Sequence, residues 1–234
     1  MRLVVFCLLA SAIFPSLSRA QAPVFTITPD DSSIRFFVKA SVALEGHFKK
    51  WDAALTFTSP DVSTGVLEIT IQADSVNTGT GMKDGKLKSE KFFNVKEYPV
   101  ISFLSKKIIQ TGRDTFEVLG DFTVRGVSKP ETLALTVLGA GTGAGEINGT
   151  MAFDRRDYGM NSGIPFIKIA ERVEVTVKLK AQRISGPPVT LKPQPAGTTV
   201  QESLDAAMRQ HQEAGMEPPI SPTLLCFCSP TLNK

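Results

Sequence analysis

The stretch Val173-Glu-Val-Thr-Val-Lys-Leu-Lys-Ala181 decides the fold class of this chain. Apolar residues occupy every second position, and charged or polar residues lie between them. Successive side chains of a β-strand point to opposite faces, so this alternation predicts a strand with one buried and one wet face. The same period of two recurs in Val24–Thr28, Ile34–Val38, Ala53–Phe57, Leu67–Ala73, Ile101–Phe103, Phe116–Val124, Leu133–Val137 and Ile147–Phe153.

Short turn-forming segments separate these expected strands, among them Pro29–Ser33, Gly126–Pro130 and the glycine-rich Gly139–Gly145. Short turns favour antiparallel meanders over βαβ units. Only Met82–Val95 has the pattern of a helical insertion. Eight or nine antiparallel strands form either a sandwich or a barrel, and the period alone leaves both open. Closure removes exposed edges and leaves room for one ligand, so we expect an all-β, eight-stranded barrel with a short helical insertion.

The two ends of the chain differ from this β-rich region. Met1 and Arg2 precede the apolar run Leu3–Phe14, and a small-residue cleavage site follows at Ala20. This arrangement is typical of a secretory signal peptide, so we expect a periplasmic or secreted protein. We expect no membrane span in the rest of the chain. The predicted organisation is a signal peptide over 1–20, a barrel domain over 23–184 and a proline-rich tail over 185–234, in which Ser203–Glu213 alone has a helical pattern.

Charge and cysteine content narrow the classes of partner. Cleavage after residue 20 removes Arg2 and Arg19 and lowers the formal net charge from +3 to +1, which gives no reason to expect a nucleic-acid partner. Only Cys226 and Cys228 remain, with His211 as the one further candidate ligand, so we expect no metal site. A disulfide between chains, and with it a homodimer, stays an open alternative.

Catalytic motifs are absent from the sequence: it has no Gly-x-Ser-x-Gly, His-Glu-x-x-His or phosphate-binding P-loop pattern. His47 stands without a partner motif, and we expect it in a turn or at a pocket rim. We expect the acidic pairs Glu171/Glu174 and Asp154/Asp157 to lie on the solvated surface. We therefore expect neither catalysis nor a cofactor.

Large apolar side chains gather on the presumed inward face of the strands. They fill a packed core or line a ligand cavity, and the pattern leaves this choice open. Lys83, Lys86 and Lys88 of the expected helical insertion would add positive charge at one mouth, suited to a phosphate head group. The candidate cavity residues are Phe36, Val38, Leu55, Phe57, Ile69, Phe103, Phe122, Val124, Leu135, Phe153 and Val175, with His47, Lys86 and Lys88 as mouth residues.

Three stretches resemble the YceI-like family of exported bacterial proteins. The first is Gly120–Leu133, with its centre at Gly126-Val-Ser-Lys-Pro130. The second is Leu87–Phe93 followed by Tyr98–Phe103. The third is the opening Phe25–Phe36, with Gly46–Phe48 and Asp74–Thr78 beyond it. The resemblance covers about residues 23–184 in the family's order.

This resemblance implies a lipocalin-like barrel that binds a polyisoprenoid or a fatty amphiphile, for transport or storage. The chain departs from the family pattern at Lys86-Leu-Lys88, where a histidine, a leucine and an arginine are usual, and at Gly85. Two other classes stay open. One is a stress-related partner-binding module with a filled barrel, and the other is an enzyme that acts on isoprenoid lipids.

Overall fold

The computed structural model describes residues 21–40, 44–162 and 169–193. The expected signal peptide and the tail beyond residue 193, with Ser203–Glu213, His211, Cys226 and Cys228, lie outside these ranges. No helix among the described residues is long and apolar enough to cross a membrane. The strands are β1 (Val24–Ala40), β2 (Leu44–Phe48), β3 (Trp51–Thr56), β4 (Val66–Gln72), β5 (Val76–Asn77), β6 (Val100–Gln110), β7 (Thr115–Val124), β8 (Val127–Leu138), β9 (Ala144–Asp154) and β10 (Ile169–Ser185). The helical elements are α1 (Gly81–Lys88) and the 3₁₀ turns η1 (Val62–Thr64), η2 (Ala73–Ser75) and η3 (Arg155–Tyr158).

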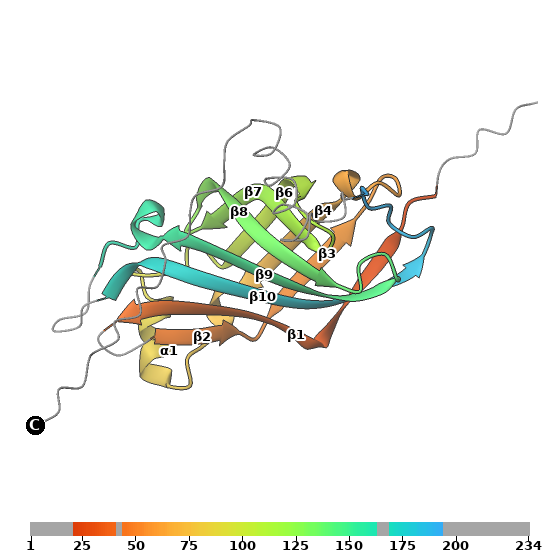
Figure 1. Ribbon diagram of the computed structural model, residues 1–234. Coiled ribbons are helices and arrows are strands. Elements are labelled where there is room, and N and C mark those ends of the chain that lie inside the picture. Colours follow the sequence, from red (N-terminus) through yellow and green to blue (C-terminus); the bar gives the residue numbers. More distant parts are fainter. Residues whose placement is uncertain (1–20, 41–43, 163–168, 194–234) are drawn as a thin grey trace, which may run out of the picture. The chain divides into compact units, whose positions relative to one another are not determined.

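The strands form one closed antiparallel barrel (Figure 1). They pair in the order β10-β9-β8-β7-β6-β4-β3-β1-β2-β5, and a ladder between β10 and β1 closes the ring. β2 and β3 follow each other beside β1, and β5 continues the line of β4 by pairing with β2. Each of these two pairs of strands therefore shares one position around the ring. Eight strand positions result, which confirms the predicted eight-stranded barrel.

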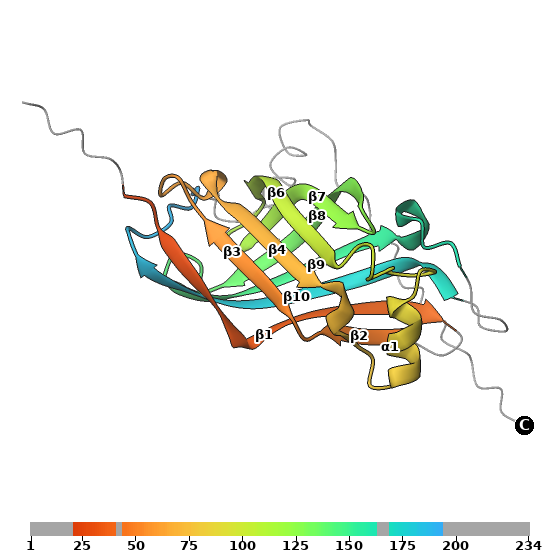
Figure 2. The same cartoon turned by 180° about the vertical axis from the view of Figure 1, so that it is seen from behind.

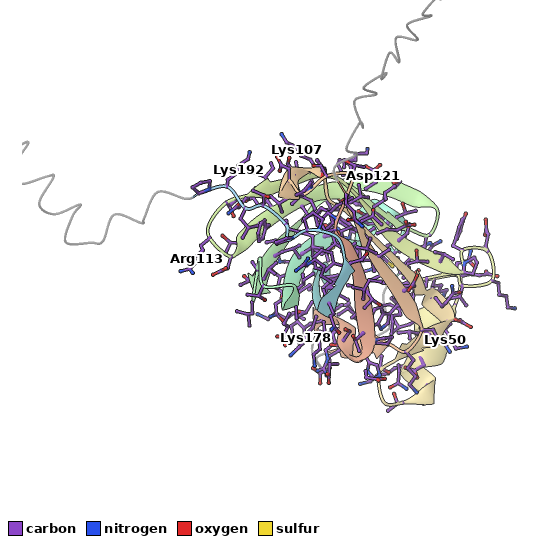
Figure 3. The ribbon with its side chains drawn as sticks, turned by 90° about the vertical axis from the view of Figure 1, so that its right-hand side faces the viewer. Lys50, Lys107, Arg113, Asp121, Lys178 and Lys192 are labelled. Carbon is purple, nitrogen blue, oxygen red and sulfur yellow. The ribbon has the colours of Figure 1, made fainter. Side chains whose placement is uncertain are left out.

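The alternating pattern places the apolar side chains inside this barrel. In β10, Val173, Val177 and Leu179 are buried, whereas Glu174 and Lys180 are exposed. Figure 3 looks along the barrel and shows charged side chains such as Lys107 and Lys178 at its periphery. Burial of the inward apolar side chains is the main favourable term in the folding of such a sheet.

One expected turn is a bulge instead. The prediction placed a turn at Pro29–Ser33, between two strands, but β1 runs through it as a single strand. The register against β10 shifts between Thr28 and Ser33, and the side chain of Ser32 accepts a hydrogen bond from the backbone N–H of Lys180 at 2.9 Å. A side-chain oxygen thus replaces the missing ladder partner, and the strand continues past the bulge.

The helical insertion is shorter than expected. The prediction of a helix over Met82–Val95 is wrong beyond Lys88, where α1 ends. Ser89 has an extended conformation and its hydroxyl donates to the carbonyl of Lys86, which caps the last turn. Asn94 then has a positive φ of 49°, a conformation that a helix does not accommodate. Residues 89–98 therefore form turns, and these turns bury Phe92.

A buried serine completes the sheet where β6 is irregular. The register between β6 and β7 shifts between Ser105 and Lys107. The ladder between β4 and β6 ends at the pair Glu68–Leu104, and the hydroxyl of Ser105 instead accepts the backbone N–H of Leu67 at 2.8 Å. Ser105 is buried, so water cannot take over this hydrogen bond.

Ser105→Ala should therefore destabilise the barrel by about 1–3 kcal/mol, the cost of leaving a buried backbone N–H unpaired. Urea unfolding would measure this change. Ser102→Ala is the matched control, because Ser102 lies half-buried on the same strand and bonds to no described residue through its side chain. Its effect should stay within about 0.5 kcal/mol. Equal effects for the two variants would contradict this role of Ser105.

Candidate functional site

The end of the barrel that carries α1 is called here the α1 end (Figure 2). An open pocket lies at this end. It has a volume of about 1080 Å³. Most of its wall comes from α1 and from the turns that follow the helix. Its cationic residues are Lys83, Lys86, Lys88, Lys91 and Lys96, and we call it the lysine pocket.

The charge of the lysine pocket is strongly one-sided. Glu90 is the one carboxylate among the described residues that line it. None of its five lysines forms an ion pair with a carboxylate in the described parts of the chain. Cations gathered in a concave surface produce a positive potential that attracts anions. The pocket is therefore suited to an anionic group.

Two hydrogen bonds tie α1 to the barrel. Thr78, just after β5, donates its backbone N–H and its hydroxyl to the Asp84 carboxylate of α1, each at 2.7 Å. These hydrogen bonds hold the pKa of the Asp84 carboxyl below its usual value. Leu87 of the same helix is buried against the barrel interior. The helix is thus held by a polar contact on one side and an apolar contact on another.

The β7–β8 hairpin holds the turns that follow α1. Its two central residues, Arg125 and Gly126, have φ values of 53° and 71°, the signs of a type I′ turn. The Arg125 guanidinium donates to the carbonyl of Phe92 at 2.8 Å. The ring of Tyr98 lies over Gly126, where a Cβ would come within 2.7 Å of it. Two of the stretches that carry the family resemblance therefore meet at this end of the barrel.

An apolar cavity of about 70 Å³ lies inside the barrel beneath the lysine pocket, and we call it the α1-end cavity. Leu44 and Ile169 line both spaces, so charged pocket and apolar interior adjoin. Aromatic rings gather around the cavity: Phe48 lies 5.7 Å from Phe36 and 6.0 Å from Phe93 between ring centroids. The remaining lining residues are mostly aliphatic.

A second aromatic cluster supports the opposite wall of this cavity. The rings of Phe122 and Phe153 lie 5.0 Å apart between centroids, tilted by 53°, and the fully buried ring of Tyr158 meets Phe153 edge-on at 5.1 Å. The Tyr158 hydroxyl lies 3.1 Å from the Glu131 carboxylate, to which it donates. Burial and this neighbouring carboxylate raise the pKa of the hydroxyl. The phenol therefore stays neutral and fixes η3 to β8.

Arg155 places a buried positive charge in the wall of the α1-end cavity. The residue is only 6% exposed. The guanidinium donates to the backbone carbonyls of Ala170 and Ser162, each at 3.1 Å, and of Met160. No described carboxylate pairs with it. These neutral acceptors satisfy hydrogen bonds but leave the charge uncompensated, so Arg155 adds to the positive potential of this end.

A separate apolar cavity of about 100 Å³ lies at the other end, called here the far cavity. Val189 and Leu191 pack over it after β10 ends. The segment is held by the backbone N–H of Thr190, which donates to the carbonyl of Pro60 at 2.7 Å. The backbone N–H of Lys192 likewise donates to the side chain of Gln110 at 2.7 Å.

The structure sorts the candidate cavity residues into three groups. Ile69 and Phe103 are buried but line neither cavity. Leu55, Phe57 and Leu135 line the far cavity. The others line the α1-end cavity: Phe36, Val38, Phe122, Val124, Phe153 and Val175.

The candidate mouth residues do not all come together. Lys86 and Lys88 line the lysine pocket, with Lys83 beside them. His47 lies instead on the exposed face of β2, a strand that the sequence prediction missed, where it pairs with Arg35 and Asn77. It lines a shallow groove that none of the pocket lysines borders.

The acidic pairs are occupied by other contacts. Glu171 pairs with Arg156 at 2.6 Å, and Asp157 pairs with Lys129 at 3.0 Å. Asp154 accepts the backbone N–H of Arg156 at the start of η3. Among the described residues, no group of three or more histidine, cysteine or acidic side chains is placed to hold a metal ion.

Sequence reasoning missed part of the site. Leu87, Phe92 and Phe93 line the α1-end cavity from outside the strands, so a period of two could not reveal them. Arg155 was missed because Asp154-Arg-Arg-Asp157 has the composition of a surface segment. The stretch Leu87–Phe93 did enter the family resemblance, and that was the available signal.

Known proteins match both the sequence and the fold. A UPF0312 protein of Shewanella denitrificans is 28% identical over 159 residues, which are 64% of this chain and 83% of that one. Protein YceI of Salmonella arizonae is 35% identical over 98 residues, 42% of this chain and 51% of that one. The crystal structure of Burkholderia cenocepacia BcnA superposes with a TM-score of 0.60 at 24% identity, over 66% of this chain and 99% of that chain.

A domain from Saccharophagus degradans shares the barrel fold as well. It is described as a polyisoprenoid binding domain implicated in plant cell wall breakdown, and it superposes with a TM-score of 0.55 at 16% identity, over 69% of this chain and 99% of that one. The family described as the YceI-like domain matches residues 25–181, which is more than half of the chain. Together with the barrel and the contacts between its signature stretches, this match shows that the chain belongs to the YceI-like domain family.

Proposed function

We propose that this chain is an exported protein that binds a long-chain isoprenoid or a similar fatty amphiphile for transport or storage, without catalysis. The observation that carries the proposal is the junction at Leu44 and Ile169, where a lysine-lined pocket adjoins the apolar interior of a closed barrel. An amphiphile has the matching arrangement, with a polar head on an apolar chain. The described polyisoprenoid binding of the Saccharophagus degradans domain supports the same class of ligand.

The charges at the α1 end favour an anionic head group. The pocket lysines would face it from the solvent side, and the buried Arg155 would add positive potential from the barrel side. The apolar chain would enter past Leu44 and Ile169 towards the aromatic rings. Each Å² of apolar surface that leaves water contributes about 25 cal/mol, so the chain supplies most of the binding free energy.

The interior must widen to hold such a chain. Pockets for drug-sized ligands usually span about 300–1000 Å³. The two apolar cavities of this barrel measure only about 70 and 100 Å³. Met151 and Met160 are buried in the interior, and their flexible side chains can adopt other rotamers at low cost. Binding therefore requires side chains to move apart as the chain enters.

These small cavities also favour one second candidate, a partner-binding module whose barrel stays filled. In that case the interior serves stability alone and recognition lies elsewhere on the chain. Ligand uptake distinguishes the two functions, because a filled barrel takes up no prenyl compound at any concentration that leaves the protein folded.

Lys86→Gln combined with Lys88→Gln should weaken the binding of farnesyl phosphate about tenfold, since two partly exposed charge contacts contribute up to about 1 kcal/mol each. The binding of farnesol, which has the same chain and a neutral head, should change less than about twofold because no charge contact is lost. Titration calorimetry at low salt would measure both.

The matched control removes the same charge elsewhere: Lys107→Gln with Lys192→Gln, at positions that Figure 3 shows at the barrel's periphery. This double variant should bind both compounds as the unchanged protein does. Equal losses for both compounds in the Lys86/Lys88 variant would contradict a charge-selective head-group site. Failure of the unchanged protein to bind either compound would favour the filled barrel.

Export is a separate part of the proposal, supported by the signal-peptide pattern of residues 1–20. Expression of the full chain in a Gram-negative host should give a mature protein that begins at Gln21 and is recovered in the periplasmic or culture-medium fraction. N-terminal sequencing of that fraction measures the cleavage site. An uncleaved chain retained in the cytoplasm would refute this part of the proposal.

A further inference from the structure

The barrel interior consists of two halves that do not connect. Within the described ranges of the chain, no residue lines both the α1-end cavity and the far cavity. In β6, Ile101 lines the first and Ile108 the second, and the inward residues Phe103 and Ser105 between them line neither. The other strands that reach from one cavity to the other also have inward residues that line neither cavity. Ile69 of β4 is an example.

Together these side chains form a packed layer across the barrel, which we call the middle layer. Phe103 is its largest buried member, with an exposure of 4%, and Met151, with an exposure of 8%, is its one methionine. The layer consists of Ile27, Trp51, Ala53, Ile69, Phe103, Ser105, Val118, Gly120, Leu133, Gly149, Met151, Val177 and Leu179.

The middle layer is tightly fitted around two glycines. The ring of Phe103 extends over Gly120, where a Cβ would come within 2.8 Å of it. A Cβ at Gly149 would lie 2.8 Å from Leu135 and 3.1 Å from Leu133. These residues lack side chains where their neighbours need the space. The layer therefore has no channel through which a lipid chain could pass without moving Phe103 or Met151.

The charged groups lie on one side of this layer only. The lysine pocket adjoins the α1-end cavity, and Arg155 lines that cavity as well. A head group held there fixes the starting point of the chain, so the depth of the α1-end half sets how many carbons fit before the middle layer is reached. A short chain ends before the layer, whereas a long chain must displace it to gain the apolar surface of the far cavity.

We propose that the middle layer, through Phe103 and Met151, discriminates between ligands by chain length. This inference rests on the proposed function and adds a specificity determinant to it. A short prenyl chain binds without disturbing the layer. A long chain gains contacts in the far half but loses part of that gain because the packed side chains must open, so the layer lowers the affinity for long chains selectively.

The test compares farnesyl phosphate with solanesyl phosphate, which has a much longer prenyl chain and the same anionic head group, on the mature full-length chain. The fluorescence of Trp51, the one tryptophan of the sequence, reports binding from within the layer. Phe103→Leu and Met151→Ala should each raise the affinity for solanesyl phosphate about tenfold, a change of about 1.4 kcal/mol. The affinity for farnesyl phosphate should change less than about twofold in both variants.

Phe122→Leu is the matched control, because Phe122 pairs with Phe103 across the sheet but lines the α1-end cavity. It should alter the affinities for both phosphates by the same factor, since both chains pass it. Met151→Phe makes the layer larger and should lower the affinity for solanesyl phosphate alone. This pair of opposite changes at Met151 keeps the test valid if Phe103→Leu does not fold.

Equal changes for farnesyl phosphate and solanesyl phosphate in the layer variants would overturn the proposed selection by length while leaving lipid binding intact. Binding of neither phosphate to the unchanged protein would instead overturn the proposed function, and the length selection with it. Higher solanesyl phosphate affinity in Phe103→Leu and Met151→Ala, lower affinity in Met151→Phe and unchanged farnesyl phosphate affinity would together support the selection by length.

Discussion

The ladder between β1 and β10 is the constraint on which the other features depend, because it joins the first strand of the barrel to the last. It extends from the pair Val24–Ser185 to the pair Ala40–Ile169 and includes the bulge at which Ser32 takes up the backbone N–H of Lys180. Once this ladder has formed, every central strand has two neighbours and the inward side chains face one enclosed space. The apolar interior therefore follows from closure.

A closed barrel alone would have two similar ends. The two ends of this barrel differ because different segments are attached to them. At the α1 end, Asp84, Arg125 and Tyr98 hold a helix and its following turns in place, and these elements carry the lysines. At the other end, the segment around Thr190 lies over an apolar cavity. The barrel therefore has a polarity along its axis, which is what an amphiphile with one charged head requires.

The sequence predicts which residues face inward but not how high each lies along the barrel axis. The period of two placed Phe103 and Phe122 inside correctly, yet it could not show that only Phe122 borders a cavity. β2 escaped prediction because Gly46 stands where the pattern needs an apolar side chain, and the ring of Phe36 fills that space. Nothing in the sequence distinguishes the two adjacent arginines of η3. The fold buries Arg155 and leaves Arg156 exposed. The sequence alone predicted the positive charge of the helical insertion, because the charge of a lysine follows from its residue type.

The proposed function depends on the barrel interior as a binding site for an amphiphile. Native mass spectrometry of the mature protein, purified from the exported fraction of the organism that produces it, tests this binding most directly. We predict a mass above that of the polypeptide by one long-chain compound, which organic extraction would identify as a prenyl or fatty amphiphile with an anionic head. A protein that shows only its polypeptide mass, and takes up no added prenyl phosphate, would contradict lipid binding and identify the barrel interior as a packed core.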